Sequence, residues 1–217
     1  MNAQTESWTL QGPAGAIQAA CDRPAGTAPA RGVAILSHPH PLFGGTMDNK
    51  VVQTLARAFV QAGWMAVRYN FRGVGQSAGS YDEGRGEVED LLHVIAQMAP
   101  AGPLALAGFS FGAFVTSQAL QRLLAQAVPR EPERLVLVGT AVSRFEVIPV
   151  PAALHARTCV IHGEVDDVVP LADVMDWARP QTLPVTVVPG VGHFFHGQLP
   201  VLKQLVMRHL LAPVAWG

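Results

Sequence analysis

The pentapeptide Gly108–Gly112, with sequence GFSFG, constrains the fold of this chain more than any other stretch. It matches the pattern G-x-S-x-G, in which a strand enters a helix through a tight turn and small residues must flank the serine. Before it, residues 103–107 (PLALA) form a short apolar run typical of a buried strand. After it, apolar residues recur at helical spacing as far as Pro129. A glycine-rich turn without chemistry could carry the same letters, so the flanking strand and helix are what predict a reactive Ser110.

A serine hydroxyl is a poor nucleophile at neutral pH and needs both a base and a group that orients the base. Candidates for both follow apolar strands further along the chain. Residues 160–170 (VIHGEVDDVVP) lead a strand into an acidic loop, and residues 186–195 (TVVPGVGHFF) lead another into a glycine-rich turn that carries His193. We therefore expect Ser110, an acid from the first loop and His193 to meet at one edge of a sheet.

The base and the acid each have rivals nearby. His193 lies in the turn after the last core strand, whereas His196 lies beyond two phenylalanines, where we expect the chain to enter the final helix. We expect that helix at about residues 199–211. Asp166 competes with Asp167 and Glu164 for the role of the acid. The spacing after the preceding glycine favours Asp166 and leaves Asp167 facing solvent or capping the next helix.

Segments with strand and helix patterns alternate along the chain. We expect strands at residues 7–11, 16–21, 33–36, 64–69, 103–107, 135–138, 158–161 and 184–188. The first two read as an antiparallel hairpin at one edge, and the later alternation predicts an α/β fold: a mostly parallel eight-stranded sheet with helices on both faces. A chain of 217 residues, 49% of them hydrophobic, can bury one large core. We expect a single domain over residues 1–217.

Composition and spacing exclude several functions. The net charge is −1 without a basic cluster, so nucleic acid is not expected as a partner. We expect no membrane segment, because no apolar run approaches the roughly 18 residues that span a bilayer, and the N-terminus lacks a signal-peptide pattern. Cys21 and Cys159 lie in separate predicted strands, which favours reduced core thiols and a cytoplasmic protein. No H-x-x-x-H or H-E-x-x-H spacing occurs, so we predict neither a metal nor another cofactor.

Four motifs in order resemble those of the α/β-hydrolase superfamily over nearly the whole chain. One is the G-x-S-x-G turn at residues 108–112, called the elbow from here on. Residues 38–41 (HPHP) look like the superfamily's oxyanion loop, residues 70–77 (NFRGVGQS) are similar to its R-G-x-G-x-S turn, and residues 162–166 (HGEVD) are similar to its acid loop. The order serine, acid, histidine is also that of the superfamily. The resemblance favours Asp166 as the acid. Within the superfamily, the short chain and the HPHP loop look most like small bacterial hydrolases related to dienelactone hydrolases and serine aminopeptidases. The chain departs from dienelactone hydrolases at one position, because they carry cysteine where this chain has Ser110.

The resemblance implies an oxyanion hole, which requires two N–H donors. The N–H of Phe111, at the start of the elbow helix, supplies one donor with help from the helix dipole. The second comes from residues 38–42, where the two prolines have no N–H. His40 is the best-placed donor there, and Leu42 is the next.

The implied activity is that of a serine hydrolase acting on carboxylic esters, with peptides, amides and thioesters as alternatives for the same triad. A binding module without catalysis would be expected to have lost a triad residue. In capped relatives a lid follows the sixth strand, but here only about twenty residues, 139–157, separate two strands. We therefore expect no cap domain and an open site for small-molecule esters with short acyl groups. Its expected apolar walls are Leu42, Phe43, Phe145 and Phe194.

The sequence also predicts the surroundings of Ser110 and the roles of three further polar residues, His38, Arg72 and His162. We expect the Ser110 hydroxyl to lie at the surface of the elbow. His38 and His162 end strands, and we expect them to be hydrogen-bonded structural histidines. Arg72 lies in a turn, where an ion pair that braces the loop is the simplest role.

Overall fold

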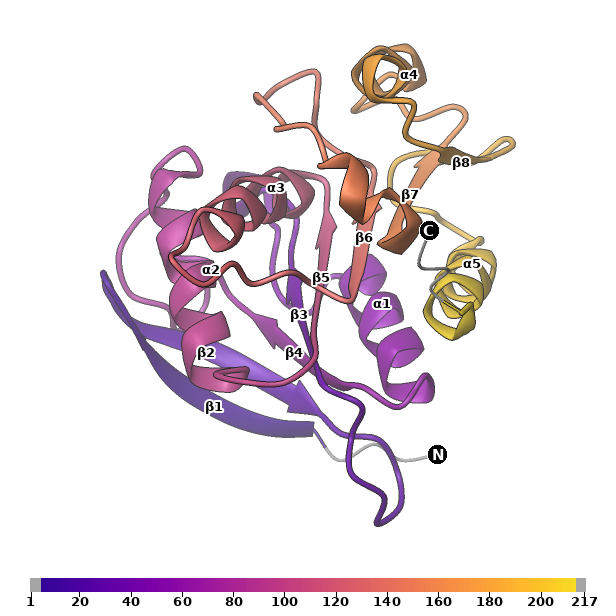
Figure 1. Cartoon of the computed structure of the whole chain (residues 1–217). Helices are drawn as coiled ribbons and strands as arrows, with labels where there is room; N and C mark the ends of the chain where they lie inside the picture. Colours follow the sequence, from indigo (N-terminus) through magenta and orange to yellow (C-terminus); the bar gives the residue numbers. More distant parts are fainter. Residues whose placement is uncertain (1–4, 214–217) are drawn as a thin grey trace.

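One eight-stranded sheet forms the centre of the protein (Figure 1). The computed structural model describes residues 5–213. The strands are β1 (Thr5–Gly12), β2 (Gly15–Asp22), β3 (Val33–Ser37), β4 (Met65–Tyr69), β5 (Leu104–Phe109), β6 (Arg134–Val138), β7 (Thr158–Gly163) and β8 (Val185–Val188). Their order is β1-β2-β4-β3-β5-β6-β7-β8. The pairs β1–β2 and β2–β4 are antiparallel and all others are parallel, which confirms the predicted edge hairpin and mostly parallel sheet.

Helices cover both faces of the sheet, as expected (Figure 1). They are α1 (Lys50–Gln61), α2 (Arg85–Met98), α3 (Phe111–Leu124), α4 (Leu171–Ala178) and α5 (Leu199–Leu211), with short 3₁₀ turns η1 (Pro41–Phe43), η2 (Ala152–Arg157) and η3 (Arg179–Gln181). Helices α1 and α5 pack together on one face, whereas α2, α3 and α4 contribute to the apolar cluster on the other face.

Strand β5 shows how the sequence produces these two cores. All of its residues are buried, because helices lie on both sides of it. Leu104 and Leu106 pack towards α2 and α3, while Ala105 and Ala107 pack towards α1 and α5. Side chains alternate between the faces of a strand, so the small residues allow close approach on one face and the large ones fill the other.

Helix α1 follows local rules at both ends. The Asn49 side chain caps it by accepting a 2.9 Å hydrogen bond from the Val51 N–H. Beyond its last turn, Gly63 has φ 87°, a conformation that stops a helix. The last helix, α5, covers the residues that the sequence predicts, Leu199–Leu211, but His196 does not begin it. Gly197 makes a left-handed turn before the helix, and Pro200 fits only in the first helical turn.

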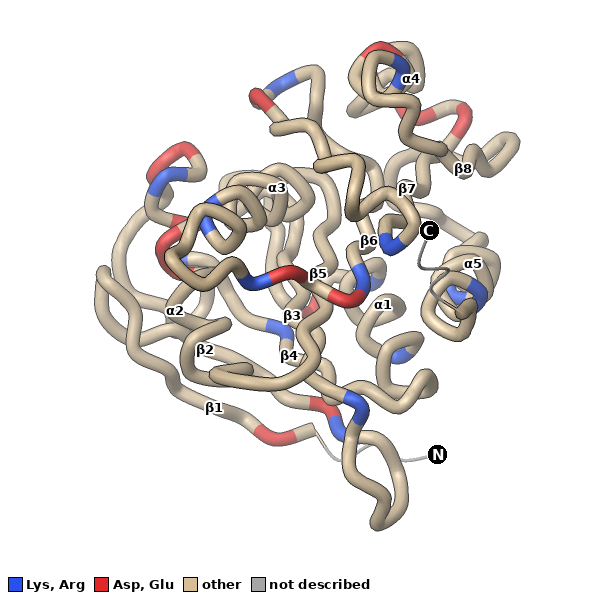
Figure 2. The backbone as a smooth tube through the Cα atoms, in the orientation of Figure 1, with Lys and Arg blue, Asp and Glu red and all other residues tan. Residues whose placement is uncertain are grey.

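The segment between β6 and β7 contains only the 3₁₀ turn η2, so no cap domain covers this end of the sheet. Figure 2 shows basic and acidic residues scattered over the backbone, with helices α1 and α5 carrying only basic ones.

Candidate active site

A strained elbow joins β5 to α3. Ser110 has φ 56° and ψ −117°, a backbone conformation that residues with a Cβ rarely adopt. Its N–H donates to the Val138 carbonyl of β6 at 2.9 Å. A Cβ at Gly108 would lie 2.4 Å from the Gly112 carbonyl oxygen, and a Cβ at Gly112 would lie 2.3 Å from the Ser37 carbonyl oxygen. Both glycines are therefore required, because they allow α3 to start directly against the sheet.

Gly112→Ala is expected to lower the free energy of unfolding by roughly 3 kcal/mol, because the new methyl group meets the rigid backbone of β3. Gly102→Ala is the control: Gly102 has φ 77° and open space around it, so only the backbone conformation is penalised, by about 1 kcal/mol. Urea denaturation measures both. Equal losses would show that close packing is not what requires Gly112.

The three residues predicted to act together do meet. His193 Nε2 lies 3.0 Å from Ser110 Oγ, and His193 Nδ1 lies 2.7 Å from Asp166 Oδ2. Because a carboxylate can only accept, Nδ1 carries the proton and Nε2 accepts from the serine hydroxyl. Ser110 is only 7% exposed, so the expectation of a surface hydroxyl is wrong: the hydroxyl lies against the His193 ring.

The competing acids lie elsewhere. Asp167 and Glu164 are exposed, whereas Asp166 is buried. The Glu164 carboxylate accepts a 2.8 Å hydrogen bond from the Gly190 N–H and so connects the loop after β7 to the loop after β8. This contact, which the sequence did not suggest, holds together the two loops that carry Asp166 and His193.

The surroundings of Asp166 keep its carboxylate ionised. Its Oδ1 accepts hydrogen bonds from the N–H groups of Val168 at 3.0 Å and Val169 at 2.8 Å. Burial alone would raise the pKa of Asp166, but the hydrogen bonds from His193 and from Val169 outweigh it and hold the pKa below its ordinary value. The carboxylate is thus fixed at both oxygens and negatively charged at neutral pH.

His193 is held by ring contacts on two sides. Its ring centroid lies 4.9 Å from that of Phe109 and 5.0 Å from that of Phe194. A Cβ at Gly139, just after β6, would lie 3.1 Å from His193 Cε1. Sequence reasoning missed Gly139, although a glycine directly after a buried strand is a usable signal. The rival His196 is exposed and packs on Phe194 instead, at 5.8 Å.

The loop after β3 brings a free backbone N–H towards the elbow. The His40 ring accepts a 3.2 Å hydrogen bond at Nδ1 from the Leu42 N–H, which is therefore already engaged. Within residues 5–213, neither the His40 N–H nor the Phe111 N–H has a hydrogen-bond acceptor. The loop is tightly wound, since a Cβ at Gly45 would lie 2.0 Å from the Pro39 carbonyl oxygen.

The predicted pocket walls form an open rim. Leu42 is 66% and Phe43 84% exposed, and Phe194 is also exposed. Phe145 is half-buried and stacks on Phe114 with ring centroids 4.7 Å apart. The remaining phenylalanines near the site, Phe109, Phe111 and Phe195, are fully buried core residues.

Phe145 also lines an open groove of about 770 Å³ beside α3. The groove contains Tyr81, whose ring lies 4.9 Å from that of His40 and which the sequence did not single out. Its charged lining residues are Glu83, Arg85, Glu89, Arg122, Arg144 and Glu146. A second hollow of about 660 Å³ lies beside α1, and neither hollow is lined by the serine, the acid or the histidine described above.

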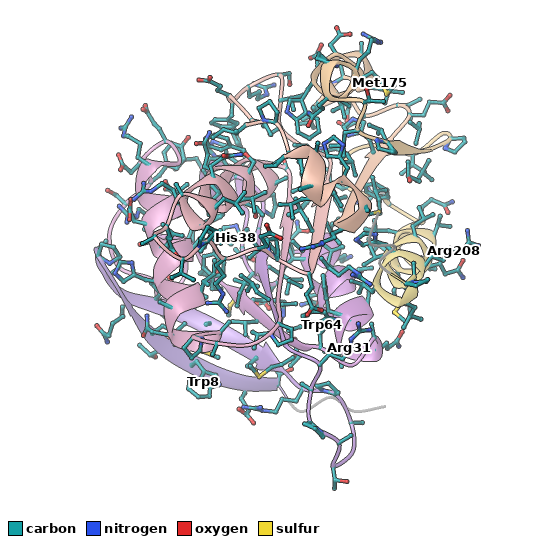
Figure 3. All side chains as sticks on the ribbon, in the orientation of Figure 1. Trp8, Arg31, His38, Trp64, Met175 and Arg208 are labelled. Carbon is teal, nitrogen blue, oxygen red and sulfur yellow. The ribbon has the colours of Figure 1, made fainter. Side chains whose placement is uncertain are left out.

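His38 is the structural histidine that the sequence predicts. It lies fully buried in the interior (Figure 3). Its Nδ1 donates to the Pro39 carbonyl at 2.6 Å, and its Nε2 accepts from the Phe71 N–H at 3.0 Å. Burial lowers the pKa of His38 to about 4, so the ring is neutral at physiological pH and holds the loop as a neutral group.

Arg72 and His162 also have structural partners. Arg72 forms two hydrogen bonds of 2.8 Å to the buried Asp90 carboxylate, the bracing ion pair that was expected. His162 is fully buried and bonds the Val169 carbonyl at 2.9 Å.

Among residues 5–213, no three or more His, Cys, Asp or Glu side chains gather in a way that could hold a metal ion. None of the described helices is long and apolar enough to cross a bilayer. Cys21 and Cys159 are both free.

Comparisons with known proteins identify the family and the fold. The profile of the serine aminopeptidase S33 family matches residues 29–159. The structure is similar to XC6422 from Xanthomonas campestris, an α/β serine hydrolase without a lid, with 36% identity, coverage of 97% of this chain and 95% of that chain, and a TM-score of 0.83. An α/β serine hydrolase homologue from Coxiella burnetii gives 38% identity, coverage of 95% and 97%, and a TM-score of 0.81.

Rickettsia prowazekii protein RP471 is 28% identical, with 93% of this chain and 87% of that protein covered. The family profile over residues 29–159 and the two similar serine hydrolase structures lead to one assignment: the chain belongs to the serine aminopeptidase S33 family of the α/β-hydrolase superfamily.

Proposed function

We propose that this protein is a serine hydrolase that cleaves carboxylic esters through an acyl-enzyme intermediate on Ser110. The observation that carries the proposal is the continuous contact from Ser110 Oγ through His193 to Asp166, at 3.0 and 2.7 Å. As Oγ attacks the acyl carbon, His193 Nε2 takes the hydroxyl proton and then returns it to the departing alcohol. A water molecule repeats these steps on the acyl-enzyme and releases the acid.

Asp166 and two backbone N–H groups complete the proposed machinery. The Asp166 carboxylate orients the imidazole and stabilises its positive charge during proton transfer. The N–H groups of Phe111 and His40 stabilise the oxyanion, since both are unengaged. His40 is preferred to Leu42 because the Leu42 N–H already donates to the His40 ring.

Peptide hydrolysis is the second candidate, and the serine aminopeptidase description of the matching family supports it. An amide needs its nitrogen protonated before it can leave, so it demands more of His193 than an ester does. Matched p-nitrophenyl ester, thioester and p-nitroanilide substrates with one acyl group separate the alternatives. We expect kcat/KM to be highest for the ester. A preference for the anilide would replace esterase with peptidase, and a preference for the thioester would replace it with thioesterase.

We predict that esters with short acyl groups react best. No cap encloses a chain, and an alkyl group laid in the groove beside α3 would desolvate charged side chains such as Arg144 and Glu146. Each methylene left in water forgoes roughly 0.8 kcal/mol of burial. Values of kcat/KM for p-nitrophenyl esters from acetate to palmitate measure the preference. An optimum at ten or more acyl carbons would contradict this prediction while leaving the triad assignment intact.

A further inference from the structure

The buried side chain of His162 lies beside Asp166, the proposed acid, and within residues 5–213 one of its two ring nitrogens is unpaired. The side chain is 0% exposed, yet its Nδ1 has no hydrogen-bond partner among the described residues. Buried polar atoms are nearly always paired, and an apolar side chain of similar shape would fill the same space without an unpaired atom. The other ring nitrogen must therefore account for a histidine at this position.

That nitrogen faces two acceptors of the acid loop. His162 Nε2 lies 2.9 Å from the Val169 carbonyl oxygen and 3.5 Å from Asp166 Oδ2. Both groups can only accept, so Nε2 carries the proton and the unpaired Nδ1 does not. A second proton on Nδ1 would be a buried donor without an acceptor, and burial accordingly lowers the pKa of His162. The ring is a neutral donor at neutral pH.

His162 reaches Asp166 by two routes. Its N–H holds the carbonyl of Val169, whose own N–H donates to Asp166 Oδ1 at 2.8 Å. The same N–H lies beside Oδ2, the oxygen that accepts from His193 Nδ1. The titratable groups that face His162 are Asp166 and His193, and its partner on β8 is the apolar Val187.

We propose that His162 is a positioning residue that fixes the Asp166 carboxylate and moderates the negative charge that Oδ2 presents to His193. The proposal deepens the serine-hydrolase assignment and concerns the same site. Without the Nε2–H, the Val169 turn loosens and Oδ2 directs its full charge at His193. The His193 imidazolium then becomes easier to form, and the carboxylate is less well oriented for catalysis.

A pair of polar substitutions separates this role from simple filling of the core. In His162→Gln the amide N–H can reach the position of Nε2, whereas in His162→Asn the shorter amide cannot. His209→Gln is the control, because His209 also bonds a backbone carbonyl, that of Arg157 at 3.0 Å, but on helix α5 away from the triad. Thermal unfolding of all three variants defines the temperature range in which each is folded.

The first readout is an NMR pH titration of the His193 ring, which needs no turnover. We expect His162→Asn to move the midpoint to higher pH by about half a unit or more, and His162→Gln and His209→Gln to leave it nearly unchanged. The second readout is kcat for an ester substrate, expected to fall about tenfold in His162→Asn and to be restored in His162→Gln.

An unchanged or lowered midpoint in folded His162→Asn overturns the proposal, as does an equal shift in His162→Gln. Because the titration follows the resting protein, a midpoint shift supports the role of His162 even if no ester is cleaved. If the unmodified protein cleaves no ester, the esterase assignment is rejected instead.

Discussion

Ser110→Ala is expected to lower kcat for ester hydrolysis by roughly 10⁶-fold, the order of loss when a triad serine is removed. The substitution deletes only the hydroxyl that contacts His193 Nε2 at 3.0 Å. Alanine keeps the Cβ and so meets the same backbone strain at φ 56°, which predicts an unchanged fold. Steady-state kinetics on p-nitrophenyl acetate, together with circular dichroism, measure both effects.

Ser143→Ala is the matched control, since Ser143 is an exposed serine in the open segment after β6. It should retain full activity. Residual activity of Ser110→Ala within tenfold of the unmodified protein, in a preparation free of contaminating esterase, would remove Ser110 from the mechanism.

Asp166→Asn is expected to lower kcat by about 10⁴-fold, the effect of this change in serine proteases with the same triad. An asparagine amide can donate to His193 Nδ1, which places the imidazole proton on Nε2, where it can no longer accept from Ser110. Asp167→Asn is the control, because that carboxylate is exposed and forms no part of the contacts to His193. The same kinetic assay compares them, and a larger loss at Asp167 would reverse the assignment of the acid.

The sequence predicted the sheet, its edge hairpin and the meeting of Ser110 with His193, because these features follow from local patterns. Short apolar runs fix the strands, and glycines beside Ser110 fix the turn. Parallel strands then bring their carboxyl ends to one edge of the sheet. Asp166 and Ser110 therefore reach His193, although they lie 27 and 83 residues from it along the chain.

Other parts of the site depend on contacts between distant segments and could not be predicted. The bond between Glu164 and Gly190, the ring contact of Tyr81 with His40 and the place of His162 behind the acid loop arise only after folding. Exposure was also difficult to predict. Phe43 and Phe195 both lie near the site in sequence, yet one is 84% exposed and the other fully buried, because loop conformation decides which side chain turns inward.

If Ser110 is an activated nucleophile, it should react covalently with a reagent that modifies such serines. A fluorophosphonate reacts with an activated serine and leaves a phosphonyl group that mass spectrometry can locate by peptide mapping. We expect one adduct, on the peptide that carries Ser110. Ser110→Ala should abolish it, and His193→Ala should strongly slow its formation. Labelling at another residue, or a folded unmodified protein that does not react at all, would show that Ser110 is not an activated nucleophile.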